Sequence, residues 1–309
     1  YEVNEFDQYM AKMRELNPDN KGLEAISFEQ LKSLYFNEKY QMLLTRINEF
    51  KTIYPKSIHS SELNYYEGDA YFQLGYWRNT IASFLNIIES INVVYLNRAI
   101  EKSAIAHIEL QEYELAIAAY KKLKQTAKND REALKALEGL MSTYYAMRDF
   151  DNVRIYAEQI IQKEDQLSAI RNAAKIYILR ALIGTGNLEE AKSLVIEIAN
   201  QANDEAGAEA SYLLAEIYYN EEKFNESIDF CISLIGKFGI YQEWTDRAYI
   251  LLVENYMASG ELLQSKATLK SILENTKNEE LRIKALELSA KVEQLEQDLF
   301  ITEKDTIDG

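Results

Sequence analysis

The chain has 309 residues, of which 47% are hydrophobic and 27% charged, and its formal net charge is −16. Such an acidic surface repels phosphate groups, which argues against nucleic acid as a partner and against docking on anionic lipid. No apolar run reaches the roughly 18 residues that a membrane-spanning helix requires. Only 11 glycines and 2 prolines are present, and both residue types disfavour helix interiors. The composition therefore predicts an almost wholly α-helical chain with no membrane span.

Residues 1–18 are predicted to form one helix of an incomplete repeat. Phe6, Met10 and Met13 precede Leu43, Ile47 and Phe50 by 37 residues, and Pro18 precedes Pro55 by the same distance. A solenoid would not expose such a face without a polar cap. We therefore expect this chain to be the C-terminal piece of a longer protein.

Residues 24–277 contain three apolar columns that recur in steps of 37, 36, 37, 38, 36 and 38 residues. The first consists of Tyr40, Trp77, Tyr113, Phe150, Leu188, Phe224 and Leu262. The second consists of Ile47, Phe84, Tyr120, Ala157, Val195, Cys231 and Leu269, and the third of Phe50, Ile87, Leu123, Ile160, Ile198, Leu234 and Ile272. Their spacing of 7 and 3 residues within each repeat places them on one helix face. It predicts seven units, 24–60, 61–96, 97–133, 134–171, 172–207, 208–245 and 246–277.

Each unit is predicted to be two helices joined by a tight turn. A fourth column, on the earlier helix, lies about six residues ahead of the first. Its members are Leu34, Tyr71, His107, Tyr144, Leu182, Tyr218 and Tyr256. Gly75, Gly186 and Gly260 occupy equivalent places between the helices, where glycine adopts the left-handed conformation that ends a helix. A lone pair cannot bury both faces, whereas stacked pairs form one continuous core.

Residues 278–298 carry Leu281, Ala285, Leu288, Val292 and Leu295 at alternating steps of 4 and 3. This amphipathic stripe predicts a capping helix on the last pair, with a coiled-coil strand as the alternative. Residues 299–309 are polar and without a period, so we expect a disordered tail.

Several motifs resemble the tetratricopeptide repeat family, among them Gly68-x-x-Tyr71 with Gly75-Tyr76-Trp77, Tyr113-Glu114-Leu115-Ala116-Ile117 and Gly186-Asn187-Leu188-Glu189-Glu190-Ala191. The resemblance covers nearly the whole chain. It implies an all-α fold: an α-α superhelical solenoid of about seven helix pairs, with the half repeat and the capping helix, forming one domain over residues 1–298. The units exceed the family's usual length of about 34 residues. Bulky Leu31, Met141, Leu179 and Val253 also replace small residues of the first helix, which implies shifted helix crossings there.

Catalytic chemistry is not indicated by any motif. His59 and His107 are far apart in sequence, and Cys231 belongs to an apolar column, as expected of an inert buried thiol. No phosphate-binding loop, zinc-ligand spacing or nucleophile elbow occurs in the sequence. We therefore predict no catalytic residue, no metal site and no cofactor.

In tetratricopeptide repeat proteins, one face of each first helix lines a concave groove that contacts ligands. The resemblance, transferred by helical phase, implies these groove residues: Tyr65, Asp69, Phe72, Gln73, Glu101, Glu109, Glu138, Tyr145, Arg180, Tyr212, Glu216, Tyr219, Asn220, Arg247 and Glu254, with Ile105, Ile108, Ser142, Ile176, Ile250 and Met257 beside them. Such a groove is acidic and rich in tyrosine. The alternative is that the tyrosines fill space between irregular helices, and the cluster Tyr212, Glu216 and Tyr219 is favoured as a binding surface.

The leading functional interpretation is a non-catalytic scaffold that holds a protein or peptide, through a basic or apolar segment, along the concave face. A second is the substrate-recruiting arm of a larger enzyme whose catalytic domain lies in a missing N-terminal part. A third is self-assembly into a homo-oligomer, through the open N-terminal face or the C-terminal helix. The lengthened, tyrosine-rich units also resemble the ends of large tetratricopeptide repeat proteins of Gram-negative envelopes. That likeness favours a bacterial periplasmic or outer-membrane-associated setting.

Overall fold

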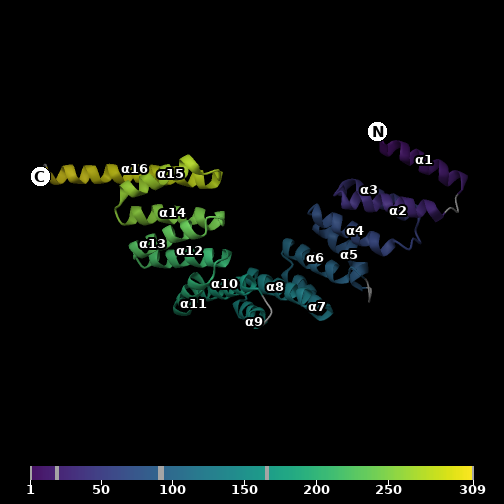
Figure 1. Cartoon of the computed structure of the whole chain (residues 1–309), viewed down its shortest axis with the longest axis horizontal. Helices are drawn as coiled ribbons and strands as arrows, with labels where there is room; N and C mark the ends of the chain where they lie inside the picture. Colours follow the sequence, from purple (N-terminus) through teal and green to yellow (C-terminus); the bar gives the residue numbers. More distant parts are fainter. Residues whose placement is uncertain (1, 18–20, 90–93, 164–166, 308–309) are drawn as a thin grey trace. The chain divides into compact units, whose positions relative to one another are not determined.

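A computed structural model describes residues 2–17, 21–89, 94–163 and 167–307. All regular secondary structure in these ranges is α-helical, in sixteen helices (Figure 1). The chain divides into two compact units, Tyr1–Asp149 and Phe150–Gly309. The sequence predicts a single solenoid over residues 1–298, and its continuity from one unit to the other stays a prediction.

The first unit contains a leading helix, three helix pairs and a closing helix. The predicted half repeat is α1 (Glu2–Leu16), whose Met10 is buried. The pairs are α2 (Lys21–Phe36) with α3 (Tyr40–Ile53), α4 (Ser60–Gln73) with α5 (Trp77–Glu89), and α6 (Leu96–Glu109) with α7 (Tyr113–Thr126). The closing helix is α8 (Asp130–Ala146). First helices also pack on one another, α4 on α6 and α6 on α8.

The second unit repeats the arrangement. It opens with α9 (Phe150–Ile161), the second helix of the predicted unit 134–171. Its pairs are α10 (Ser168–Gly184) with α11 (Leu188–Gln201), α12 (Glu205–Asn220) with α13 (Phe224–Lys237), and α14 (Gln242–Ala258) with α15 (Leu262–Asn275). The last helix, α16 (Glu279–Ile307), packs on α14 and α15. The predicted all-α fold of helix pairs, with a half repeat and a capping helix, is confirmed.

Every turn inside a predicted helix pair contains one residue with a left-handed backbone. The three glycines are Gly75, Gly186 and Gly260, as predicted. The other four are Glu38, Gln111, Arg148 and Glu222, with φ of 59° or 60°. In each turn the amide after this residue donates a hydrogen bond to a carbonyl of the fourth column, as from Tyr76 to Tyr71 at 2.9 Å. This bond satisfies a carbonyl that the helix end leaves free, and the first-column residue then begins the second helix.

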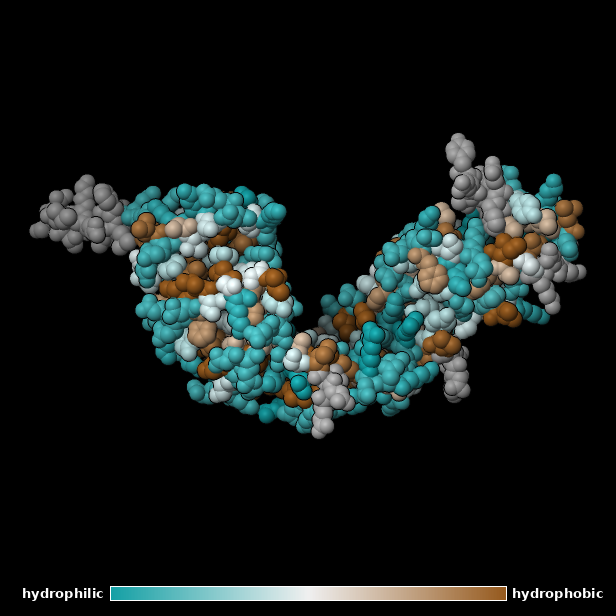
Figure 2. All heavy atoms as spheres, viewed as in Figure 1, coloured by the Kyte–Doolittle hydropathy of each residue, from teal (hydrophilic) through white to brown (hydrophobic). Residues whose placement is uncertain are grey.

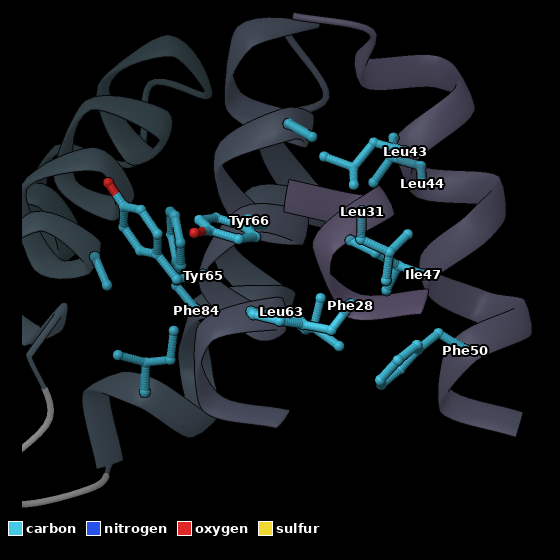
Figure 3. Close-up of a cluster of buried hydrophobic side chains, with 13 residues drawn as sticks. Phe28, Leu31, Leu43, Leu44, Ile47, Phe50, Leu63, Tyr65, Tyr66 and Phe84 are labelled. Atoms are coloured by element: carbon cyan, nitrogen blue, oxygen red, sulfur yellow. The ribbon is translucent and has the colours of Figure 1, made fainter. Parts of the chain in front are cut away.

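The second and third columns form the core, because each of their members is buried. The small residues three positions after the first column are fully buried, namely Thr80, Ala116, Val153, Ala191, Ser227 and Ser265. Figure 3 shows this packing for α2 to α5, where Leu63, Tyr65 and Phe84 point into one cluster. Removing these side chains from water is the main stabilising contribution to the stack.

Close helix packing explains the glycine in the first helix of the second pair. A Cβ placed on Gly68 would lie 2.4 Å from the ring of Phe84 on α5. In the other units this position holds Leu31, Ala104, Met141, Leu179, Ala215 and Val253, all of them buried. Four of the other units therefore pack a bulky side chain at this position, whereas the ring of Phe84 leaves no room for one at Gly68.

Polar side chains near the starts of α6, α10 and α14 form hydrogen bonds to the N-terminal end of the first helix that follows each of them. The amide of Asn97 donates to Glu132 of α8 at 2.6 Å, and that of Asn172 donates to Asp204, the N-cap of α12, at 3.0 Å. Asp246 accepts in turn from Asn278, next to the start of α16, at 2.6 Å. These bonds fix the register between successive helix pairs.

The C-terminal helix differs from its prediction at one end. Leu281, Ala285, Leu288 and Val292 are buried as the stripe predicts, whereas Leu295 is 38% exposed. The helix continues to Ile307, so the prediction of a disordered tail from residue 299 is wrong as far as residue 307. The physical reason is that no glycine or proline interrupts the sequence before Gly309. Residues 308 and 309 lie outside the described residues.

Candidate functional site

The first helices carry a column of large side chains that remain partly exposed. Its members are Tyr35, Phe72, Ile108 and Tyr145 in the first unit and Ile183, Tyr219 and Met257 in the second. They follow one another in the same steps as the core columns. Three residues before them stand Lys32, Asp69, Ile105, Ser142, Arg180, Glu216 and Glu254. We call these two columns the first-helix face, since residues three apart share one side of a helix.

In the first unit, charges on the first-helix face pair across neighbouring helices. The carboxylate of Asp69 on α4 accepts from the hydroxyl of Tyr35 on α2 at 2.5 Å and forms an ion pair with Lys102 of α6. The ammonium of Lys102 also lies 4.8 Å from the centre of the Phe72 ring. Both carboxylate oxygens of Asp69 thus have a partner, and its side chain is buried. Asp69 is therefore not an exposed contact residue.

Tyr65 is a second correction to the predicted groove. Its ring is 5% exposed and stacks on Tyr95, with ring centres 4.3 Å apart. Burial raises the pKa of its hydroxyl. Tyr65 belongs to the core shown in Figure 3, as the space-filling alternative predicts.

The remaining predicted residues of the first unit are at least partly accessible. Glu101 forms an ion pair with Lys135 of α8 at 2.7 Å, and the carboxylate of Glu138 is half-buried with a pKa raised by that burial. Phe72 and Tyr145 are half-buried, whereas Gln73 and Glu109 are exposed. This part of the face is less acidic than predicted, because Lys102 and Lys135 offset Asp69 and Glu101.

In the second unit, α10 and α12 are joined by a strong ion pair. The guanidinium of Arg180 donates two hydrogen bonds to the buried carboxylate of Glu209, at 2.7 and 2.8 Å. Beyond it on α12, the hydroxyl of Tyr212 donates to Glu216 at 3.2 Å. Tyr219, one turn further, is half-buried, and Asn220 at the helix end is exposed. The favoured cluster Tyr212, Glu216 and Tyr219 therefore lies along one side of a single helix.

An open cavity of about 600 Å³ adjoins this cluster between α12, α14 and α16. Tyr212, Arg247 and Glu254, all predicted groove residues, line it together with Ile250 and Lys284. Arg247 is exposed, donates to Glu243 at 2.8 Å and lies over the Trp244 ring, 4.9 Å from its centre. Burial raises the pKa of Glu254, and the charge of Glu216 raises it further. Three predicted residues thus meet at one hollow of mixed apolar and charged character.

No protein-family model matches the chain, and no curated protein matches its sequence. Solved structures do match. A tetratricopeptide repeat protein from Parabacteroides merdae aligns with 86% of this chain and 98% of its own, at 14% identity and a TM-score of 0.57. The C-terminal part of a tetratricopeptide repeat-containing protein from Cytophaga hutchinsonii aligns with 83% of this chain and 98% of its own, at 15% identity and a TM-score of 0.59. This chain has the tetratricopeptide repeat fold.

The apo form of RapI is also similar, over 90% of this chain and 82% of its own, at 14% identity and a TM-score of 0.59. At these identities the likeness concerns the tetratricopeptide repeat fold alone. Within each unit, the first-helix face is a side of the helix pairs whose large side chains stay partly exposed.

The predicted groove residues do not include two lysines of the last helix, Lys284 and Lys291. Lys284 lines the cavity, and Lys284 and Lys291 lie close enough to Glu254 to lower its pKa against the effect of burial. Both belong to α16, for which the sequence predicts a capping helix and no groove residue. The repeat spacing contains the signal, because Arg247 and Glu254 advanced by 37 residues give Lys284 and Lys291.

The cysteine and one histidine of this tetratricopeptide repeat fold are packed against other residues of the protein. Cys231 is fully buried, and burial raises the pKa of its thiol to about 12. His107 contacts Glu112, just before α7, at 2.8 Å. Among the described residues, no three His, Cys, Asp or Glu side chains come together as a metal site. Within the same residues, no helix is long and apolar enough to cross a membrane.

Proposed function

We propose that this chain is a protein-interaction scaffold whose first-helix face holds a segment of another protein. The observation that carries the proposal is the repeated column of partly exposed large side chains within each unit, from Tyr35 to Tyr145 in the first and from Ile183 to Met257 in the second. Such side chains offer contact area that is already held by rigid helices, so little conformational entropy is lost on binding. A surface of this kind binds through many moderate contacts.

The chemistry of the partner follows from the charge. The chain has a net charge of −16, and in the second unit Glu216 and Glu254 stand three residues before the large side chains of Tyr219 and Met257. A segment that alternates apolar and basic side chains complements both columns. Figure 2 shows that hydrophobic side chains gather in small patches between hydrophilic ones on the visible surface of both units.

The test compares two charge-matched double variants in affinity capture from the native cell, with crosslinking and mass spectrometry. Glu216→Lys with Tyr219→Ala alters the first-helix face. Glu274→Lys with Ile232→Ala makes the same kind of change on the second helices α15 and α13, at exposed positions. We expect the first variant to lose partner proteins that the second retains, with unchanged helical circular dichroism for both. Equal capture by both variants would rule out the first-helix face as the binding surface.

A further inference from the structure

The cavity between α12, α14 and α16 combines an apolar floor with a charged rim. Ile250 and Leu251 of α14 and Leu281 of α16 contribute the floor, and the ring of Tyr212 stands at the side contributed by α12. Its volume of about 600 Å³ falls within the range of pockets that hold small molecules or anchoring side chains. It lies wholly within the second unit.

Most charged groups around the cavity are already paired. Arg247 donates to Glu243 at 2.8 Å, and Lys284 lies 3.7 Å from Glu287. Asp246 accepts hydrogen bonds from Gln242 at 2.7 Å and from Asn278 at 2.6 Å. Because these charged side chains already interact with other residues of the protein, they do not require a ligand to neutralise them.

The carboxylate of Glu254 is different. No hydrogen bond or ion pair joins it to another residue that the structure describes, although its side chain is half-buried. Tyr212, Glu216 and Tyr219 lie near it on α12, and the charges of Lys284 and Lys291 on α16 act on it without forming an ion pair with it. A partly desolvated carboxylate without a hydrogen-bond donor costs free energy, and a cationic donor from outside would remove that cost.

We propose that this cavity takes an arginine side chain of the partner segment, with its guanidinium on Glu254 and Glu216. The aliphatic stem lies on Ile250 and the ring of Tyr212, and the neighbouring residues of the segment rest on Leu251 and Leu281. Guanidinium suits the site because it is planar, stacks on aromatic rings and donates to two carboxylates at once. This assignment rests on the proposed function and names the side chain that the first-helix face anchors.

The experiment titrates three probes into the isotopically labelled full chain and follows the side-chain carboxyl signal of Glu254 and the ring signals of Tyr212 by NMR. The probes are an acetylated and amidated leucine-arginine-leucine tripeptide, the same tripeptide with citrulline for arginine, and free argininamide. Citrulline has the shape of arginine without its charge. We expect the arginine tripeptide to bind with a dissociation constant on the order of 1 mM and the citrulline tripeptide about tenfold more weakly.

Matched variants separate the site from general charge attraction. Glu254→Gln is expected to weaken the arginine tripeptide about tenfold, whereas Glu274→Gln, which removes the same charge from α15, leaves its affinity unchanged. Unmoved Glu254 and Tyr212 signals, or equal affinity for the citrulline tripeptide, would overturn the proposal. Free argininamide that binds as tightly as the tripeptide would overturn its assignment to a protein segment.

Failure of this proposal is distinguishable from failure of the proposed function. If Glu216→Lys with Tyr219→Ala loses partner capture while Glu254→Gln retains it, the first-helix face binds the partner without an arginine in this cavity. If neither variant changes capture, the partner binds elsewhere on the chain, and the proposed role of the first-helix face is wrong.

Discussion

Arg180 of α10 and Glu209 of α12 form a two-pronged ion pair, with hydrogen bonds of 2.7 and 2.8 Å between guanidinium and carboxylate. The side chain of Glu209 is 8% exposed and that of Arg180 32%. The pair therefore joins successive first helices in the interior of the second unit. Sequence phase predicts Arg180 as a binding residue, whereas its contacts give it a structural role.

Arg180→Met tests that role. The substitution retains the aliphatic stem and leaves the Glu209 carboxylate buried without its donor, so we expect the free energy of unfolding to fall by about 2 to 3 kcal/mol. Urea unfolding followed by circular dichroism measures the loss. The matched variant is Arg154→Met on α9, where the arginine side chain is 53% exposed and pairs with Glu158 at 3.0 Å. Exposed pairs contribute below about 1 kcal/mol, so equal losses in the two variants would contradict the structural assignment.

The sequence predicts the helix pairs well because burial repeats with the period of the fold. Positions such as Ile47 and Phe84 meet the same environment in every pair, since each pair packs on another like itself. Exposure at other first-helix positions does not repeat in this way. Tyr65 and Tyr212 occupy equivalent positions, yet Tyr65 is covered by Tyr95 while Tyr212 lines an open cavity. The covering residue comes from an irregular segment just before α6, which periodicity does not describe.

Charge pairing between first helices was also outside the sequence prediction. Asp69 pairs with Lys102 at a separation of 33 residues, and Glu101 with Lys135 at 34. These separations equal one repeat minus one helical turn, because the longer side chain reaches back along the neighbouring helix. Opposite charges at that spacing are the signal to seek in chains of this fold. A prediction that leaves out these paired lysines gives a groove that is more acidic than the structure shows.

The turns offer a test of stability. Glu222 has a left-handed backbone, with φ of 59°, which costs a residue with a Cβ about 1 kcal/mol relative to glycine. We therefore expect Glu222→Gly to raise the free energy of unfolding by about 1 kcal/mol. Gly186→Ala, at the equivalent turn with φ of 75°, is expected to lower it by a similar amount.

The control for this pair is Ala267→Gly, an exposed position within α15. There glycine meets an ordinary helical backbone and costs about 1 kcal/mol. Chemical unfolding measures the free energy of unfolding of the three variants. It distinguishes the effect of glycine at a left-handed turn from its effect within a helix. Destabilisation by Glu222→Gly would show that the left-handed turn is not maintained.

Gly68 tests how tightly α4 packs on α5. A Cβ at this position would lie 2.4 Å from a ring carbon of Phe84, so we expect Gly68→Ala to cost about 1 to 3 kcal/mol through overpacking. Combining it with Phe84→Leu makes room for the methyl group, and the double variant is expected to lose less than the sum of the single losses.

Gly236→Ala is the matched control for Gly68, because no atom lies within 4 Å of the added Cβ. It lies within α13, where alanine favours the helix by up to about 1 kcal/mol. Thermal unfolding of both variants gives the comparison. Strictly additive losses for Gly68→Ala and Phe84→Leu would contradict the close contact.

Glu254 gives the protein a pH dependence with a definite sign. Burial and the neighbouring Glu216 raise the pKa of its carboxyl above the usual 4.5, so the folded chain holds this proton more tightly than the unfolded chain. Stability from this group is then fully present below pH 4.5 and is lost as the pH rises through the higher, folded-state pKa. Because glutamine cannot ionise, a Glu254→Gln variant does not lose this stability as the pH rises.

We therefore expect Glu254→Gln to raise the thermal midpoint at pH 7, by a free energy of roughly 0.5 kcal/mol because half of the side chain remains in water. The difference from the unsubstituted chain should vanish near pH 4, where the carboxyl is protonated in both states. Glu274→Gln, at an exposed position on α15, should show no such pH dependence. A lower midpoint for Glu254→Gln at pH 7 would mean that the carboxylate is already stabilised within the protein, and that the cavity has no unmet charge for a partner's guanidinium to neutralise.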